Sequence, residues 1–233
     1  MTSANCRQTV WLPIVVAALA LSVFVKPSTA RAEPGFEVGA RLGYGIPLGE
    51  VAEGSDLSDG ISGQIPIWLD VGYRPMDELM IGLYFQYGIG FIGGSFDEVC
   101  DLDGVDCSAS DIRLGVQAHY HISPLEQLDP WIGLGVGYEW ISFGAEGMGA
   151  EITTTADGFE FLNLQAGLDI SVAEHFKLGP FLSFSLGQFG SASFECTGGP
   201  ACGGTGSIDG DIEEKGMHQW LVIGVRGAYT PTP

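Results

Sequence analysis

The chain has 233 residues and a formal net charge of −20; only 16% of its residues are charged, whereas 45% are hydrophobic and 36 are glycine. This mixture is unfavourable both for a water-facing surface and for helices. Because so acidic a chain repels phosphate backbones, the composition excludes a nucleic-acid partner and argues against a nuclear or ordinary cytosolic protein.

The amino terminus has the layout of an export signal. Arg7 precedes an apolar run over residues 12–25, and a small-residue pattern ends at Ala32. The alternative, a membrane anchor, needs roughly 20 apolar residues, and this run has about 14. We therefore expect a signal peptide over residues 1–32, cleaved after Ala32, and one domain over residues 33–233. In that domain 29 acidic residues outnumber six basic ones, which gives a net charge of −23.

Polar and apolar residues alternate in eight segments of this domain, which predicts β-strands. In the segment 79–91 every odd-numbered residue is apolar or aromatic, whereas the even-numbered residues include glycines and Gln86. No apolar run reaches about 18 residues, so membrane-spanning helices are excluded. The expected strands cover residues 36–45, 64–74, 79–91, 111–121, 131–141, 160–172, 177–187 and 218–229.

The second face of these strands is polar. It carries arginines together with carboxylates that can pair with them, namely Glu37, Arg41, Asp70, Arg113, Glu139, Asp169 and Arg226. The dry core of a sandwich cannot hold such a face, whereas the narrow interior of a small closed barrel can, so the apolar face must meet lipid. A strand of about ten residues, at roughly 3.3 Å per residue and a tilt near 45°, rises about 23 Å, which matches the apolar band of an outer-membrane barrel.

The connections between the expected strands alternate between long and short. Long connections follow the first, third, fifth and seventh strands, and short turns follow the second, fourth and sixth. In bacterial outer-membrane barrels the long loops are extracellular and the short turns periplasmic, so both chain ends are expected in the periplasm. Most tyrosines lie on the apolar face near strand ends, where they form two belts at the level of the lipid headgroups.

These features resemble the small outer-membrane barrels of the OmpA transmembrane domain, OmpX and OmpW type. The resemblance covers nearly all of residues 33–233 and is one of pattern, without a diagnostic signature. The last strand ends in an aromatic residue, Tyr229, like the segment by which such proteins are recognised for insertion, although a Thr-Pro-Thr-Pro tail follows it. The resemblance implies an all-β, eight-stranded antiparallel up-and-down transmembrane β-barrel. It also implies outer-membrane lipids and the barrel-assembly machinery as partners.

The long loops contain the four cysteines of the mature chain and most of its acidic residues. In an oxidising compartment, pairing within each loop, Cys100 with Cys107 and Cys196 with Cys202, is the most economical of three connectivities. The only base in these loops is Lys215. Clustered carboxylates attract hard divalent cations, and we expect weak, diffuse association rather than a dedicated metal site.

The predicted interior admits two interpretations. Paired ions can plug the barrel or line a gated path, and eight strands leave space for little more than their own side chains, which favours the plug. His119 and His121 share a strand face, but their spacing reveals no third metal ligand, so we expect them to form hydrogen bonds. The Gly-x-Gly-x-x-Gly pattern at residues 88–93 opens no helix, so it does not indicate a dinucleotide site.

We therefore expect an outer-membrane barrel that is not an enzyme and has no cofactor, catalytic residue or dedicated metal site. Its acidic loops would serve structural or surface-interaction roles, or its interior would form a narrow pore. The alternative is an OmpW-like channel for small solutes, including apolar ones. A lipid-modifying enzyme would need a histidine beside a serine and a carboxylate at the outer rim, where His218 is the only candidate and has no obvious partner.

Overall fold

The computed structural model describes residues 35–52, 54–94, 100–147, 149–198, 202 and 206–231. The expected signal peptide and its cleavage after Ala32 lie outside these residues. Among the residues that the structure describes, no helix is long and apolar enough to cross a membrane.

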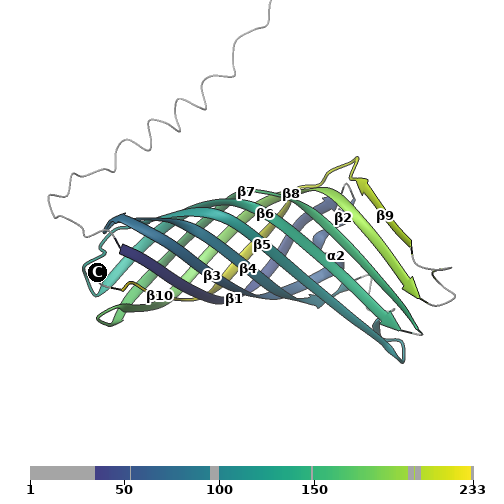
Figure 1. Cartoon of the computed structure of the whole chain (residues 1–233), viewed down its shortest axis with the longest axis horizontal. Coiled ribbons are helices and arrows are strands. Elements are labelled where there is room, and N and C mark those ends of the chain that lie inside the picture. Colours follow the sequence, from purple (N-terminus) through teal and green to yellow (C-terminus); the bar gives the residue numbers. More distant parts are fainter. Residues whose placement is uncertain are drawn as a thin grey trace, which may run out of the picture. The chain divides into compact units, whose positions relative to one another are not determined.

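Eight long antiparallel strands form a closed up-and-down barrel in the described part of the chain (Figure 1). Each strand pairs with the next one along the chain, and the last closes the ring by pairing with both the first and the seventh. These strands are β1 (Gly35–Ala52), β3 (Ile61–Met76), β4 (Leu79–Ile92), β5 (Val105–His121), β6 (Leu128–Gly147), β7 (Ala150–Ala173), β8 (Phe176–Gly198) and β10 (His218–Tyr229).

The barrel has two different ends. At the turn end, short connections join β3 to β4, β5 to β6 and β7 to β8. The opposite end, which we call the loop end, carries further elements within the described parts of the remaining connections. These are β2 (Ser55–Asp56), the single-turn helix α2 (Leu57–Gly60) and β9 (Gly206–Asp211), which pairs with β8.

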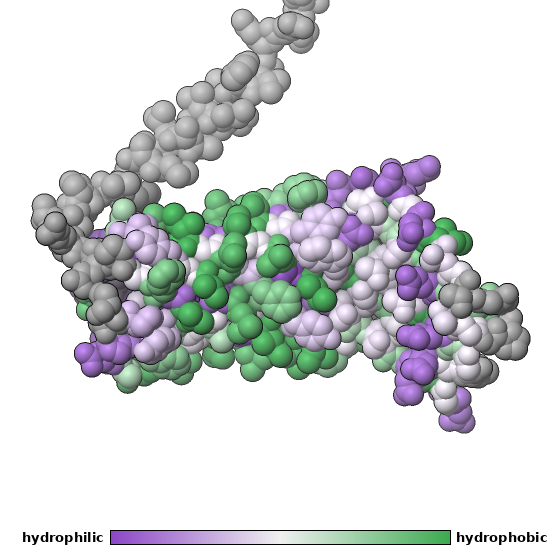
Figure 2. All heavy atoms as spheres, in the orientation of Figure 1, coloured by the Kyte–Doolittle hydropathy of each residue, from purple (hydrophilic) through white to green (hydrophobic). Residues whose placement is uncertain are grey.

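Side chains along each strand alternate between the outside and the inside of the barrel, because successive residues of a strand point to opposite faces. On β4, Leu83 is 56% exposed whereas the neighbouring Tyr84 is 1% exposed. Such outward apolar side chains occur on all eight long strands. On the face drawn in Figure 2 they form a broad green band between two ends where hydrophilic residues gather. Apolar surface of this extent on the outside of a folded domain indicates contact with lipid.

The strands are longer than the alternation predicts. Only residues 148 and 149 separate β6 from β7, so the expectation of a long loop after residue 141 is wrong. The cause is a reversal of polarity along β6. Up to Trp140 the outward residues are apolar or aromatic, but then Ser142 and Glu146 face outward while Ile141 faces inward and is buried. Where a strand leaves lipid for water its outward residues no longer need to be apolar, and a search for apolar outward residues stops there.

Five strands continue beyond this reversal at the loop end and form an open sheet. Residues 105–110 of β5 pair with β6, followed in order by β7, β8 and β9. Two disulfides, Cys100–Cys107 and Cys196–Cys202, lie in this region. The pairing within each connection that the sequence favours is therefore confirmed.

Candidate functional site

The barrel interior near the turn end is filled by a hydrogen-bonded network around Arg41. Its guanidinium donates two hydrogen bonds to Asp70, from Nε to Oδ2 at 2.7 Å and from Nη2 to Oδ1 at 2.8 Å. Gln117 and Gln165 accept further hydrogen bonds from it, at 2.9 Å and 2.7 Å. The ring of Trp68 lies 4.6 Å from the guanidinium carbon. Such bidentate pairs are among the strongest that side chains form, and they fix the position of both partners.

A second group of ions surrounds Glu37 on β1. Arg74 Nε donates to Glu37 Oε2 at 2.6 Å, and Arg226 Nη2 donates to Glu37 Oε1 at 2.5 Å. Arg226 also forms an ion pair with Asp169, which accepts a hydrogen bond from Trp131 Nε1 at 3.0 Å. Strands β1, β3, β6, β7 and β10 are thereby joined across the interior.

A third group lies closer to the loop end and is centred on Arg113. This guanidinium lies 2.8 Å from Asp111, 3.1 Å from Glu139 and 3.3 Å from Glu160. His218 Nε2 lies 2.8 Å from the other oxygen of Glu139. One arginine therefore faces three buried carboxylates. This group, which we call the Arg113 cluster, carries an excess of negative charge when the three carboxylates are ionised and the imidazole is neutral.

The structure places all seven predicted lumen residues inside the barrel, each at most 2% exposed. Sequence reasoning missed other members of the network. Arg74 and Asp111 lie at the ends of expected strands and fit the predicted alternation. They would have been identified if the polar face had been followed to the last residue of each strand. Glu160 lies beside a β-bulge between Glu160 and Leu162 that shifts the alternation of β7 by one residue. A register shift of this kind leaves no signal in a period-two pattern.

The paired histidines have a third potential ligand that their spacing did not reveal. Ligand atoms of Glu37, His119 and His121 lie within 4.8 Å of one another. However, His121 Nδ1 lies 2.7 Å from Asp129 Oδ2, and its Nε2 lies 2.9 Å from Arg74 Nη2. The guanidinium of Arg74 thus lies where a cation would sit, which favours hydrogen bonding over metal binding.

The expectation that His218 has no obvious partner is wrong. Its Nε2 contacts Glu139, and its ring stacks on Phe189 with 4.1 Å between ring centroids. The side chain is 1% exposed, so it lies inside the barrel rather than on the rim. The partner belongs to a strand far away in sequence, so spacing along the chain cannot identify it.

Apolar side chains close the barrel between the Arg113 cluster and the loop end. One buried core, which we call the plug, is made of apolar side chains and is distinct from the paired ions of the lumen. It includes Leu57, Ile61, Ile141, Phe189 and Trp220. Leu57 comes from α2, so the connection between β1 and β3 folds into the mouth of the barrel instead of extending away from it. The interior is therefore polar only along the part of the strands whose outside is apolar.

A cavity of about 420 Å³ lies beside the plug at the loop end, and we call it the mouth cavity. Its walls come from α2, from the ends of β1, β4, β6 and β7, and from the Cys100–Cys107 disulfide. Apolar side chains of this lining include Val51, Leu57, Ile92, Phe143, Ala145 and Ile152.

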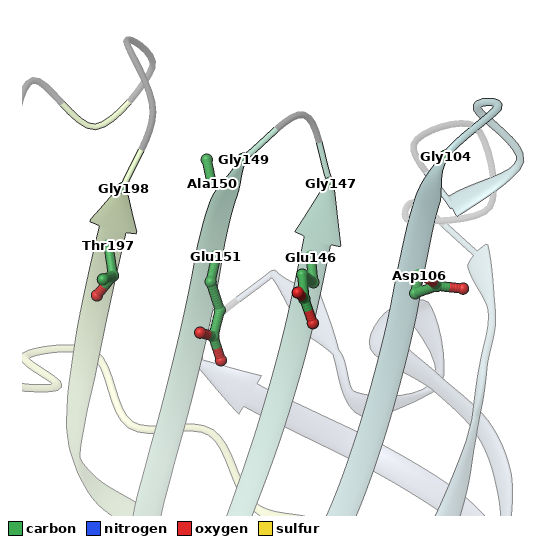
Figure 3. A pocket seen from close by; sticks show the side chains of 9 residues that line it. All are labelled: Gly104, Asp106, Glu146, Gly147, Gly149, Ala150, Glu151, Thr197 and Gly198. Carbon is green, nitrogen blue, oxygen red and sulfur yellow. The ribbon is translucent and has the colours of Figure 1, made fainter.

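A shallow groove of about 480 Å³ crosses the tips of β5 to β8 (Figure 3). The β-register places Asp106 opposite Glu146 and Glu146 opposite Glu151. Like charges in directly opposite positions repel each other, so this acidic row attracts cations. None of its members belongs to the compact three-ligand groups found among the described residues.

Solved structures share this fold. A major outer membrane protein from Thermus thermophilus matches with a TM-score of 0.61 at 14% sequence identity, over 85% of this chain and 99% of that chain. Neisserial surface protein A matches at 0.50 and 14%, over 83% and 97%. Outer membrane protein OprG from Pseudomonas aeruginosa matches at 0.50 and 14%, over 87% and 99%. No protein family and no curated protein matches the sequence. The likeness is therefore one of fold, that of small bacterial outer-membrane β-barrels.

Proposed function

We propose that this chain is an integral outer-membrane protein with a closed barrel, and that its role is structural or one of surface interaction. The fold of the barrel and its outward apolar band support the membrane location. We infer that the turn end of the barrel faces the periplasm and that the loop end faces the outside, because short turns are periplasmic and long loops extracellular in bacterial outer-membrane barrels. Outer-membrane lipids surround the barrel, and the barrel-assembly machinery inserts it.

The closed interior carries this proposal. The charged side chains that fill the lumen are almost completely buried; Arg113 and Arg226 are each 0% exposed. A conducting path needs hydrated space beside such groups. Each guanidinium of the lumen is instead paired with at least one carboxylate. Unpairing a buried ion costs several kcal/mol, which opposes spontaneous opening.

The open sheet at the loop end is the part of the molecule that fits a surface role. Its outward side carries hydroxyl groups and carboxylates, including the acidic row, and such a side favours contact with water. Divalent cations associate weakly with these carboxylates and can bridge them to anionic headgroups nearby.

Recording from refolded protein in planar bilayers tests the closed barrel. We expect no stepwise conductance from the wild type over a range of voltages that leaves the bilayer intact. Stepwise openings of uniform size that appear only when the protein is present would contradict the proposal and favour a narrow pore.

The interior supports neither a channel for small solutes nor a lipid-modifying enzyme. A solute would have to pass both the plug and the Arg113 cluster, although the mouth cavity offers it an apolar entrance. A lipid-modifying enzyme would need an accessible histidine, whereas His218 is buried and its Nε2 is engaged by Glu139. We therefore propose no catalytic activity.

A further inference from the structure

The mouth cavity is a built site rather than a gap between loops. The single turn of α2 forms one wall and packs closely on its neighbours. A Cβ added to Gly60 would lie 2.9 Å from the ring of Phe143, and one added to Gly94 would lie 2.5 Å from the carbonyl oxygen of Asp59. Gly94 has a φ of +63°, which favours glycine. These contacts hold α2 against β6 and against the end of β4.

The floor and walls of the mouth cavity are apolar, and its volume lies within the range of small-molecule sites. Leu57, Phe143 and Ile152 line it from three different elements, and the Cys100–Cys107 disulfide adds a further apolar surface. The plug separates the mouth cavity from the lumen. A ligand therefore enters the cavity from the loop end and cannot pass further into the barrel.

Two carboxylates lie in the polar part of the lining. Asp56 is the residue before α2 and Asp59 lies within α2, and both are exposed. The Asp56 side chain makes no capping hydrogen bond to α2, so its carboxylate is free to face a ligand. Among the described residues of the lining none is basic.

We propose that the mouth cavity binds an amphiphilic organic cation. The apolar body of the ligand occupies the cavity, and its ammonium group lies beside Asp56 and Asp59. An anionic amphiphile is repelled by these carboxylates and by the strongly negative charge of the domain, and a neutral one gains only the apolar contacts. This binding site goes beyond the proposed structural role and does not depend on whether the barrel conducts.

Three probes of one size test the charge preference. We would titrate 1-naphthylmethylammonium, 1-naphthalenemethanol and 1-naphthoate into protein held in zwitterionic lipid nanodiscs, and subtract the heat measured with empty nanodiscs. The ammonium should bind at one site at least tenfold more tightly than the alcohol, and the naphthoate should not bind. The preference for the ammonium should shrink as salt rises, because salt screens exposed charges. Equal affinities, tighter naphthoate binding or no binding would overturn the proposal.

Variants locate the site. The double variant Asp56→Asn/Asp59→Asn should lower the affinity for the ammonium to that for the alcohol and leave the alcohol unaffected. The control Asp209→Asn/Asp211→Asn removes the same charge from β9, outside the lining, and should change neither affinity. Ala145→Trp fills the cavity and should abolish binding of both probes. If the ammonium binds equally to the first double variant and the wild type, the proposal is wrong. This double variant alters only exposed side chains and decides the question even if Ala145→Trp fails to fold.

Discussion

Arg113 illustrates how a single buried residue can hold several strands together. Its guanidinium joins Asp111 of its own strand to Glu139 on β6 and Glu160 on β7. Since one positive charge faces three carboxylates, removing the base has a very different effect from removing one of the acids.

Replacing Arg113 by methionine should therefore be severe. The variant Arg113→Met leaves three buried carboxylates without a guanidinium, and we expect a loss of about 3–5 kcal/mol in the free energy of unfolding. The matched variant Glu160→Gln relieves the negative excess and keeps a side chain that can hydrogen-bond, so it should cost no more than about 1 kcal/mol. Urea unfolding in lipid vesicles measures both. Equal losses for the two variants would show that the charge balance of the cluster does not matter.

Glycines of the interior have a comparable role at the points of closest approach. A Cβ added to Gly82 would lie 2.4 Å from the carbonyl oxygen of Val71 and 2.7 Å from the Cα of Gly72, whereas one added to Gly210 has nothing within 4 Å. Gly82→Ala should cost about 1–3 kcal/mol because the backbone of β3 must move. Gly210→Ala should stay within about 0.5 kcal/mol of the wild type. Thermal unfolding of the two variants compares them directly, and a harmless Gly82→Ala would mean that β3 and β4 are less tightly packed than described.

Within the strands, the sequence predicts the apolar band well and the regions beyond it poorly. The eight strands and the two faces along the band follow from alternation, because lipid outside and ion pairs inside impose opposite polarities on neighbouring residues. The up-and-down order of the strands is what the resemblance to small outer-membrane barrels implies. Beyond Trp140 the outside is water and the polarity reverses, so the same pattern cannot indicate where the strand ends. The bulge beside Glu160 and the folding of α2 into the mouth depend on contacts between distant segments, which leave no periodic signal.

The two disulfides lie at the loop end and should stabilise that end alone. They join residues only 7 and 6 positions apart, and closures of this length contribute roughly 2–3 kcal/mol each. Reduction should therefore speed amide hydrogen exchange in residues 100–107 and 191–198. Exchange in residues 131–140 of β6 should stay unchanged. If reduction instead released protection along the full length of β6, the open sheet and the barrel would have to unfold as one unit.

The acidic surface of the folded domain should respond to cations as a diffuse field. Excess negative charge at the loop end opposes compactness, and salt screens this repulsion. Thermal stability should rise with NaCl, and CaCl₂ at matched ionic strength should add only a shallow increase in the millimolar range. A saturable rise below about 0.1 mM CaCl₂ would instead indicate a dedicated calcium site, since such affinities require a compact set of ligands.

Spin labels placed along one strand test the central claim most directly. The claim is that the apolar face of the barrel meets lipid and that the polarity of the two faces reverses at the loop end. Labels would replace Ile132, Val136 and Glu146, which all face outward on β6. Collisions with oxygen, which concentrates in lipid, and with a water-soluble nickel chelate are then compared in reconstituted vesicles. At Ile132 and Val136 oxygen should dominate, and at Glu146 the nickel chelate should dominate. Nickel-accessible labels at Ile132 and Val136, or labels there that neither reagent reaches, would show that the apolar face does not meet lipid.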